Sequence, residues 1–117
     1  MSIALIVDDD MPTRYVYAHV LHGLGYEVLE ASDGEEAVRL LTQVKPVLIL
    51  LDLRLPRRPG DEVLNHIYGD PALENSRVAV ITAMPKSSPP PMRPHDIFLI
   101  KPVLPDQIRE FALQTMP

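Results

Sequence analysis

Five short runs of aliphatic residues recur along this chain of 117 residues. Each run is nearly unbroken rather than alternating with polar residues, which is typical of strands that are covered on both faces. The runs occupy residues 2–7, 26–31, 47–51, 78–82 and 97–101. Strands of this kind, with helical segments between them, predict an α/β domain built on a parallel sheet.

The segments between the first four runs have the spacing of amphipathic helices. The first contains Pro12 in its opening turn, where a missing backbone N–H does no harm. The second opens with Ser32-Asp33-Gly34-Glu35, which has capping-box spacing. A third helix is expected at 60–68 and a last one from about residue 105. We expect residues 1–117 to form a single domain.

The connection before the fifth run departs from this pattern. Five of the ten residues from Pro85 to Pro94 are proline. A proline inside a helix removes a backbone donor and clashes with the preceding turn, at a cost of about 3 kcal/mol. Residues 83–96 are therefore expected to form an extended, polyproline-like loop with at most one short turn, in place of a crossover helix.

Composition excludes several classes of function. A net charge of -5 provides no basic field, so direct binding to nucleic acid is not expected. No apolar run approaches the ~20 residues that cross a bilayer, and no signal peptide is recognisable at the N-terminus. The absence of cysteine excludes disulfides and sulfur-based zinc sites. We expect a cytoplasmic protein that does not bind membranes.

Polar residues stand at the ends of four of the five runs. Asp8 and Asp9 follow the first run, Asp52 follows the third, Thr82 ends the fourth and Lys101 ends the fifth. The carboxyl ends of parallel strands share one edge of a sheet, where open α/β folds bind ligands, so these residues are expected to meet. Three carboxylates repel one another unless a hard cation such as Mg²⁺ neutralises them. An aspartate beside that ion can attack phosphorus, with a hydroxyl and an ammonium as donors to the phosphoryl group.

Four segments together resemble a known family, the receiver domain of bacterial two-component response regulators. They are Val7-Asp8-Asp9-Asp10, Leu51-Asp52-Leu53-Arg54-Leu55-Pro56, Ile81-Thr82-Ala83 and Lys101-Pro102. The resemblance covers nearly the whole chain except about 85–96. It implies a flavodoxin-like, doubly wound sheet of five parallel strands in the order 2-1-3-4-5, here with the fourth crossover helix lost or reduced to a loop. Since that helix commonly contributes to the family's output face, the sequence does not predict which surface of this chain transmits the signal.

The resemblance also implies the roles of the acidic residues. Asp52 is the expected phosphoryl acceptor. Mg²⁺ is the expected cofactor, held by Asp8, Asp9 and Asp52 and by the backbone carbonyl of Arg54.

Further roles concern the fourth and fifth runs. Thr82 is expected to bind the phosphoryl oxygen, and Lys101 to pair with the acceptor or its phosphate. Phe98 matches an aromatic position whose rotamer follows the hydroxyl, although it could equally be ordinary core. The bond between Lys101 and Pro102 is expected to be cis.

The implied function is that of a phosphoacceptor in a two-component or phosphorelay pathway. A histidine kinase or a histidine phosphotransfer protein would donate the phosphoryl group, and a downstream protein, which the sequence does not identify, would receive the signal. The chain would catalyse only its own phosphorylation and slow dephosphorylation, so it is not expected to be an enzyme in the usual sense. A weak homodimer is also compatible with the sequence.

Two other functions compete with this one. The first is a phosphorylation-independent interaction module that retains the site by descent. The second is a hydrolase that works through an aspartyl-phosphate, but such enzymes usually carry a second aspartate two residues after the nucleophile, where this chain has Arg54.

Overall fold

The computed structural model describes residues 2–83 and 90–115. Five parallel strands form one sheet in the order β2-β1-β3-β4-β5. The strands are β1 (Ile3–Val7), β2 (Glu27–Ala31), β3 (Leu48–Asp52), β4 (Arg77–Thr82) and β5 (Ile97–Ile100). The helices are α1 (Met11–Gly23), α2 (Gly34–Gln43), α3 (Gly60–Tyr68), the short 3₁₀ helix η1 (Pro71–Leu73) and α4 (Pro105–Thr115). This confirms the flavodoxin-like fold and its strand order.

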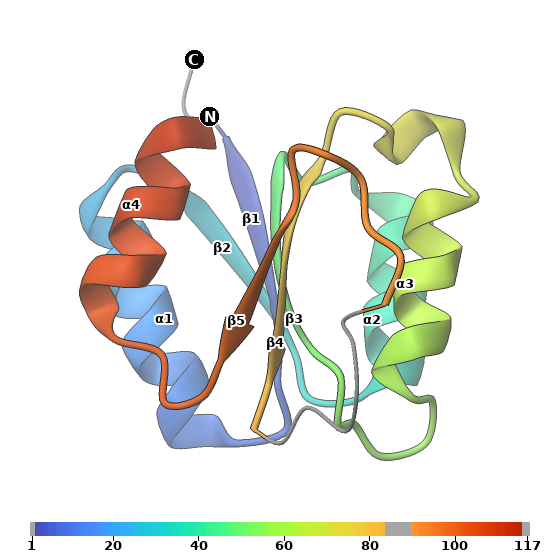
Figure 1. Ribbon diagram of the computed structural model, residues 1–117, viewed down its shortest axis with the longest axis horizontal. Coiled ribbons are helices and arrows are strands. Elements are labelled where there is room, and N and C mark those ends of the chain that lie inside the picture. The colour runs from blue at the N-terminus through green and yellow to red at the C-terminus, as the bar shows by residue number, and fades with distance from the viewer. Residues whose placement is uncertain (1, 84–89, 116–117) are drawn as a thin grey trace.

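Two helices cover each face of the sheet (Figure 1). Helices α1 and α4 lie on one face, and α2 and α3 lie on the other. Successive residues of a strand point to opposite faces, so Ile6 and Leu50 belong to the first core while Leu5 and Leu51 belong to the second. Every residue of β3 is buried, which explains its unbroken apolar run. Within the described residues, no helix is long and apolar enough to cross a membrane.

The first two helices begin at aspartates that follow strands. Asp10 caps α1 by accepting a hydrogen bond from the backbone N–H of Thr13, and Asp33 caps α2 by accepting one from Glu36. The Glu36 carboxylate accepts a hydrogen bond from the backbone N–H of Ser32 at 2.8 Å. The predicted capping box, with Ser32 as the cap and Glu35 as its partner, is therefore wrong by one residue: Asp33 is the cap, and Glu36 makes the reciprocal bond to the Ser32 N–H.

The connection between β4 and β5 contains no helix at Ala83 or at 90–96, the part of it that the structure describes. A turn at Pro94 and His95 precedes β5, closed by a hydrogen bond from the Asp96 N–H to the Arg93 carbonyl at 3.0 Å. Residues 84–89 of the predicted loop lie outside the described residues. The helix labelled α4 follows β5 and is the last helix predicted from the sequence.

Asp96 anchors this connection to the sheet. Its side chain is fully buried. One carboxylate oxygen accepts a hydrogen bond from the Val78 N–H of β4 at 2.8 Å, and the other accepts one from the Tyr68 hydroxyl of α3 at 2.7 Å. The guanidinium of Arg93 lies 3.0 Å from that second oxygen and neutralises its charge. No sequence motif or periodicity indicates this buried network.

Arg93 also joins the connection to η1. Its guanidinium lies over the ring of Tyr68, 4.5 Å from the centroid. The same group donates hydrogen bonds to three backbone carbonyls, those of Leu73, Glu74 and Ser76, at 3.0, 3.2 and 2.6 Å. Side-chain contacts thus hold residues 93–96 against α3 and η1.

Gly60, the first residue of α3, has no room for a side chain. A Cβ there would lie 2.4 Å from the Leu53 Cα and 2.6 Å from the Asp52 carbonyl oxygen, both of them backbone atoms. We expect Gly60→Ala to lower the free energy of unfolding by about 3 kcal/mol, because the loop after Asp52 must move. Urea denaturation measures this change. Gly23→Ala is the matched control, since nothing lies within 4 Å of its added carbon, and an equal loss in both variants would contradict the prediction.

Candidate functional site

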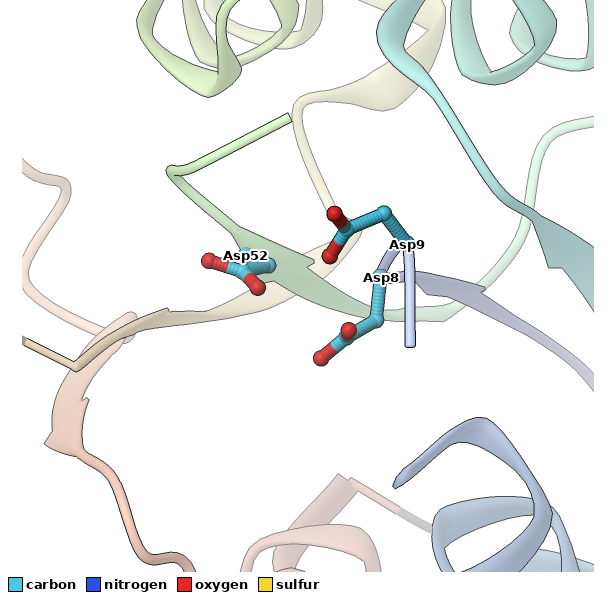
Figure 2. A group of neighbouring side chains, drawn as sticks. All are labelled: Asp8, Asp9 and Asp52. Carbon is cyan, nitrogen blue, oxygen red and sulfur yellow. The ribbon is translucent and has the colours of Figure 1, made fainter. Parts of the chain in front are cut away.

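The predicted acidic residues meet at the carboxyl edge of the sheet. Asp8 and Asp9 follow β1, and Asp52 is the last residue of β3 (Figure 2). Their carboxylates lie together, with one oxygen of each within 4.8 Å of the others. Asp8 and Asp52 are buried, whereas Asp9 is exposed. The parallel arrangement of β1 and β3, with Val7 opposite Leu51, is what brings these carboxylates together.

Lys101 bridges two of the three carboxylates. Its ammonium donates hydrogen bonds to Asp8 Oδ2 and Asp52 Oδ2, both at 2.9 Å. Backbone N–H groups hold the remaining oxygens, with Asp10 donating to Asp8 Oδ1 and Arg54 donating to Asp52 Oδ1, each at 2.9 Å. Both buried carboxylates are therefore oriented by one charged and one backbone donor.

Burial and pairing act in opposite directions on the charges of this site. Burial raises the pKa of Asp8, and the hydrogen bonds from Asp10 and Lys101 offset that rise only in part. Burial alone would lower the pKa of Lys101, but its hydrogen bonds to Asp8 and Asp52 outweigh burial and raise it. Lys101 is therefore a fixed positive charge at neutral pH.

Thr82 reaches the same edge as the last residue of β4 and is buried. Its carbonyl accepts a hydrogen bond from the backbone N–H of Lys101 at 2.8 Å, which ties the ends of β4 and β5 together. Phe98 lies two residues before the exposed Ile100 in β5 and packs against the core between the sheet and α2 and α3. The bond between Lys101 and Pro102 is cis.

The donor set of this edge suits a hard divalent cation. Asp8, Asp9 and Asp52 offer carboxylate oxygens within 4.8 Å of one another, and Mg²⁺ prefers one or two carboxylates together with carbonyl and water oxygens. The exposed Asp9 leaves one side of the cluster open to solvent for an ion or a phosphoryl group.

Two features beside the site were not identified from the sequence. Arg14 of α1 donates a hydrogen bond to the Asp8 carbonyl at 2.7 Å. A groove of about 430 Å³ lies next to Lys101, between α1 and the segment that follows β5. Its lining residues are Thr13, Val16, Tyr17, Lys101, Pro102 and Val103. Burial raises the pKa of Tyr17 to about 12, so this phenol stays neutral. The only available signal for these features was the helical spacing of α1, which does not reveal what the helix packs against.

Comparison with known proteins places this geometry in a family. Residues 4–112 match the response regulator receiver domain. The sporulation initiation phosphotransferase F of Bacillus subtilis is 35% identical over 79 residues, which are 68% of this chain and 62% of that protein. Other curated relatives are longer, and the chain spans 18% to 34% of the length of several of them.

Solved structures agree with this assignment. The receiver domain of the hybrid histidine kinase CckA is 29% identical, with a TM-score of 0.79 over 99% of this chain and 100% of that one. The response regulator TrrA of Thermotoga maritima, solved in complex with Mg²⁺ and BeF, has the same fold at 24% identity, with a TM-score of 0.79 over 99% of this chain and 100% of that one. Because the family match covers nearly all of the described fold and its acidic edge, this chain belongs to the response regulator receiver domain family.

Proposed function

We propose that the chain accepts a phosphoryl group on Asp52 in a two-component or phosphorelay pathway. The observation that carries this proposal is the Asp52 carboxylate, buried beside two further carboxylates and held by the Lys101 ammonium and the Arg54 N–H. Receiver domains partner with histidine kinases or phosphotransfer proteins, so the donor would be a phosphohistidine of such a protein. We place the protein in the cytoplasm, with residues 1–117 acting as one receiver domain.

The transfer is a displacement at phosphorus. A carboxylate oxygen of Asp52 forms a new bond to phosphorus as the bond to the donor nitrogen breaks, which leaves an acyl phosphate and a free imidazole. Asp8, Asp9, Asp52 and the Arg54 carbonyl would hold Mg²⁺. The bound ion would neutralise charge on the phosphoryl oxygens. A relative with the same fold, from Thermotoga maritima, was solved in complex with Mg²⁺ and BeF, which supports a Mg²⁺ site in this chain.

Two side chains would stabilise the transferred group. Lys101 would exchange its hydrogen bond to Asp52 for one to a phosphoryl oxygen, and the Thr82 hydroxyl would donate to another. Both residues end neighbouring strands that are linked by a backbone hydrogen bond. Movement of Thr82 toward the phosphoryl group would therefore change the end of β5, and with it the surface offered to a downstream protein. A change of the Phe98 rotamer that follows the Thr82 hydroxyl is a further prediction.

Intact mass after incubation with acetyl phosphate tests the proposal. We expect one added phosphoryl group on wild type that requires Mg²⁺ and is absent from Asp52→Asn, because the amide cannot act as the nucleophile. Wild type incubated with EDTA is the control. If wild type gains no mass and binds no Mg²⁺, the chain works instead as a phosphorylation-independent interaction module.

A further inference from the structure

Arg14 contacts the backbone of the acidic cluster without belonging to it. Its Nη1 donates a hydrogen bond to the Asp8 carbonyl at 2.7 Å, and its Nε donates one to the Glu30 carboxylate at 3.0 Å. The side chain is only 14% exposed. Glu30 lies opposite Ile6 in the β1–β2 register, so it stands on the face of the sheet that α1 covers. The guanidinium thus joins α1, β2 and the end of β1.

The carbonyl that Arg14 contacts belongs to the peptide unit that leads into Asp9. Among the residues that the structure describes, no hydrogen bond reaches the Asp9 side chain, so the backbone is what limits the positions that its carboxylate can take. The backbone N–H groups on either side of Asp9 are hydrogen-bonded as well: that of Asp8 donates to the Ala31 carbonyl at 3.1 Å, and that of Asp10 donates to Asp8 Oδ1 at 2.9 Å. Neither of them fixes the carbonyl side of the peptide between Asp8 and Asp9.

We propose that Arg14 is a positioning residue for the metal site. By holding the Asp8 carbonyl, it fixes the peptide plane that aims Asp9 toward Asp8 and Asp52. Glu30 orients the guanidinium for this contact. The inference rests on the Mg²⁺ site of the proposed function and assigns that site a support outside its ligands.

The charge of Arg14 and its positioning effect act on Mg²⁺ affinity in opposite directions. The sign of the affinity change on removing Arg14 therefore tells which of them dominates. A guanidinium beside three carboxylates weakens their attraction for a divalent cation. If charge alone mattered, removing Arg14 would tighten Mg²⁺ binding. If positioning dominates, removing it weakens binding, because Asp9 no longer lies where the ion needs it.

Calorimetric titration of the full chain with Mg²⁺ separates these outcomes. We expect Arg14→Met to bind Mg²⁺ about tenfold more weakly than wild type. The double variant Arg14→Met with Glu30→Gln keeps the net charge of wild type, and we expect the same weakening in it. Arg14→Lys retains a donor and the charge, so it should recover part of the affinity and also gives a result if Arg14→Met does not fold.

A second measurement needs no metal. Amide hydrogen exchange at Asp8 and Asp10, whose N–H groups are hydrogen-bonded, should be about tenfold faster in Mg²⁺-free Arg14→Met than in Mg²⁺-free wild type, since a loosened loop opens more often. Arg39→Met is the control, because that side chain is 65% exposed and removes the same charge from the surface of α2.

Three outcomes would overturn the inference. A positioning role is excluded if Arg14→Met binds Mg²⁺ at least as tightly as wild type. It is also excluded if the double variant binds Mg²⁺ with wild-type affinity. Wild type that binds no Mg²⁺ overturns the proposed metal site and this inference together.

Discussion

Replacing Arg93 by methionine is expected to lower the free energy of unfolding by about 4 kcal/mol, the largest stability loss that we predict for a single side chain. Methionine fills much of the same space but cannot neutralise Asp96, whose side chain is fully buried. The Val78 N–H and the Tyr68 hydroxyl would remain as its neutral donors. The backbone carbonyls of Leu73, Glu74 and Ser76 would also lose a charged donor.

Urea denaturation followed by circular dichroism measures this loss. Arg39→Met is the matched control, and we expect it to change the unfolding free energy by no more than about 0.5 kcal/mol, because Arg39 is mostly exposed. A loss below about 1 kcal/mol in Arg93→Met would show that the buried carboxylate does not depend on its partner.

A double-mutant cycle apportions the effect between the two partners. Asp96→Asn keeps an acceptor for the Val78 N–H and removes the buried charge, so it should cost less than Arg93→Met. The loss in free energy of unfolding in the double variant should be smaller than the sum of the two single losses by at least about 1 kcal/mol. Additive losses would mean that Arg93 stabilises the fold through the backbone carbonyls and the Tyr68 ring rather than through Asp96.

This network lies away from the acidic edge, because Asp96 precedes β5 and Lys101 follows it. Phosphorylation per folded molecule should therefore stay close to wild type in Arg93→Met. A loss of phosphorylation in protein that is still folded would show that the anchored connection also shapes the site.

The second large effect is expected at Lys101. Replacing it by methionine leaves Asp8 and Asp52 buried side by side without their shared counter-charge. We expect Mg²⁺ to bind at least about tenfold more tightly, because the ammonium no longer competes for those carboxylates. Phosphorylation by acetyl phosphate at saturating Mg²⁺ should slow by about 100-fold, since one donor to the phosphoryl oxygens is lost.

Calorimetric titration with Mg²⁺ tests the predicted affinity. Intact mass over time in acetyl phosphate tests the predicted rate of phosphorylation. Lys45→Met is the control, because it removes the same charge from a partly exposed ion pair with Asp70. A Lys101→Met variant with unchanged affinity and rate would mean that the ammonium contributes neither to the metal site nor to the transfer.

Lys101 should also leave a signature in the pH dependence of stability. Its pKa is raised in the folded protein above the ordinary value of 10.5, so its contribution to stability is complete below that pH and is lost as pH rises through the folded pKa. Unfolding free energies should therefore fall above pH 10.5 more steeply in wild type than in Lys101→Met. Parallel curves would contradict the charge pairing seen in the structure.

The sequence determined the sheet and the acidic edge because both depend on local pattern and strand polarity. Unbroken apolar runs indicate strands covered on both faces, and Leu48–Asp52 is buried throughout. Once parallel strands are inferred, the residues at their carboxyl ends must share one edge. Strand polarity therefore predicts that Asp8, Asp9 and Asp52 lie together, as they do in the structure. Prolines likewise predict the absence of a helix before β5, and residues 90–96, the described part of that segment, contain none.

Tertiary structure alone decided which side chains support that framework. Arg93 meets carbonyls 17 to 20 residues away, and Arg14 meets Glu30 across 16 residues, through the turn between α1 and β2. Such contacts depend on how far each helix extends and how it packs, and neither hydrophobic periodicity nor a motif encodes this. Lys101 could be expected at the edge from the sequence, but its equal hydrogen bonds to Asp8 and Asp52 follow from where β5 ends beside β4.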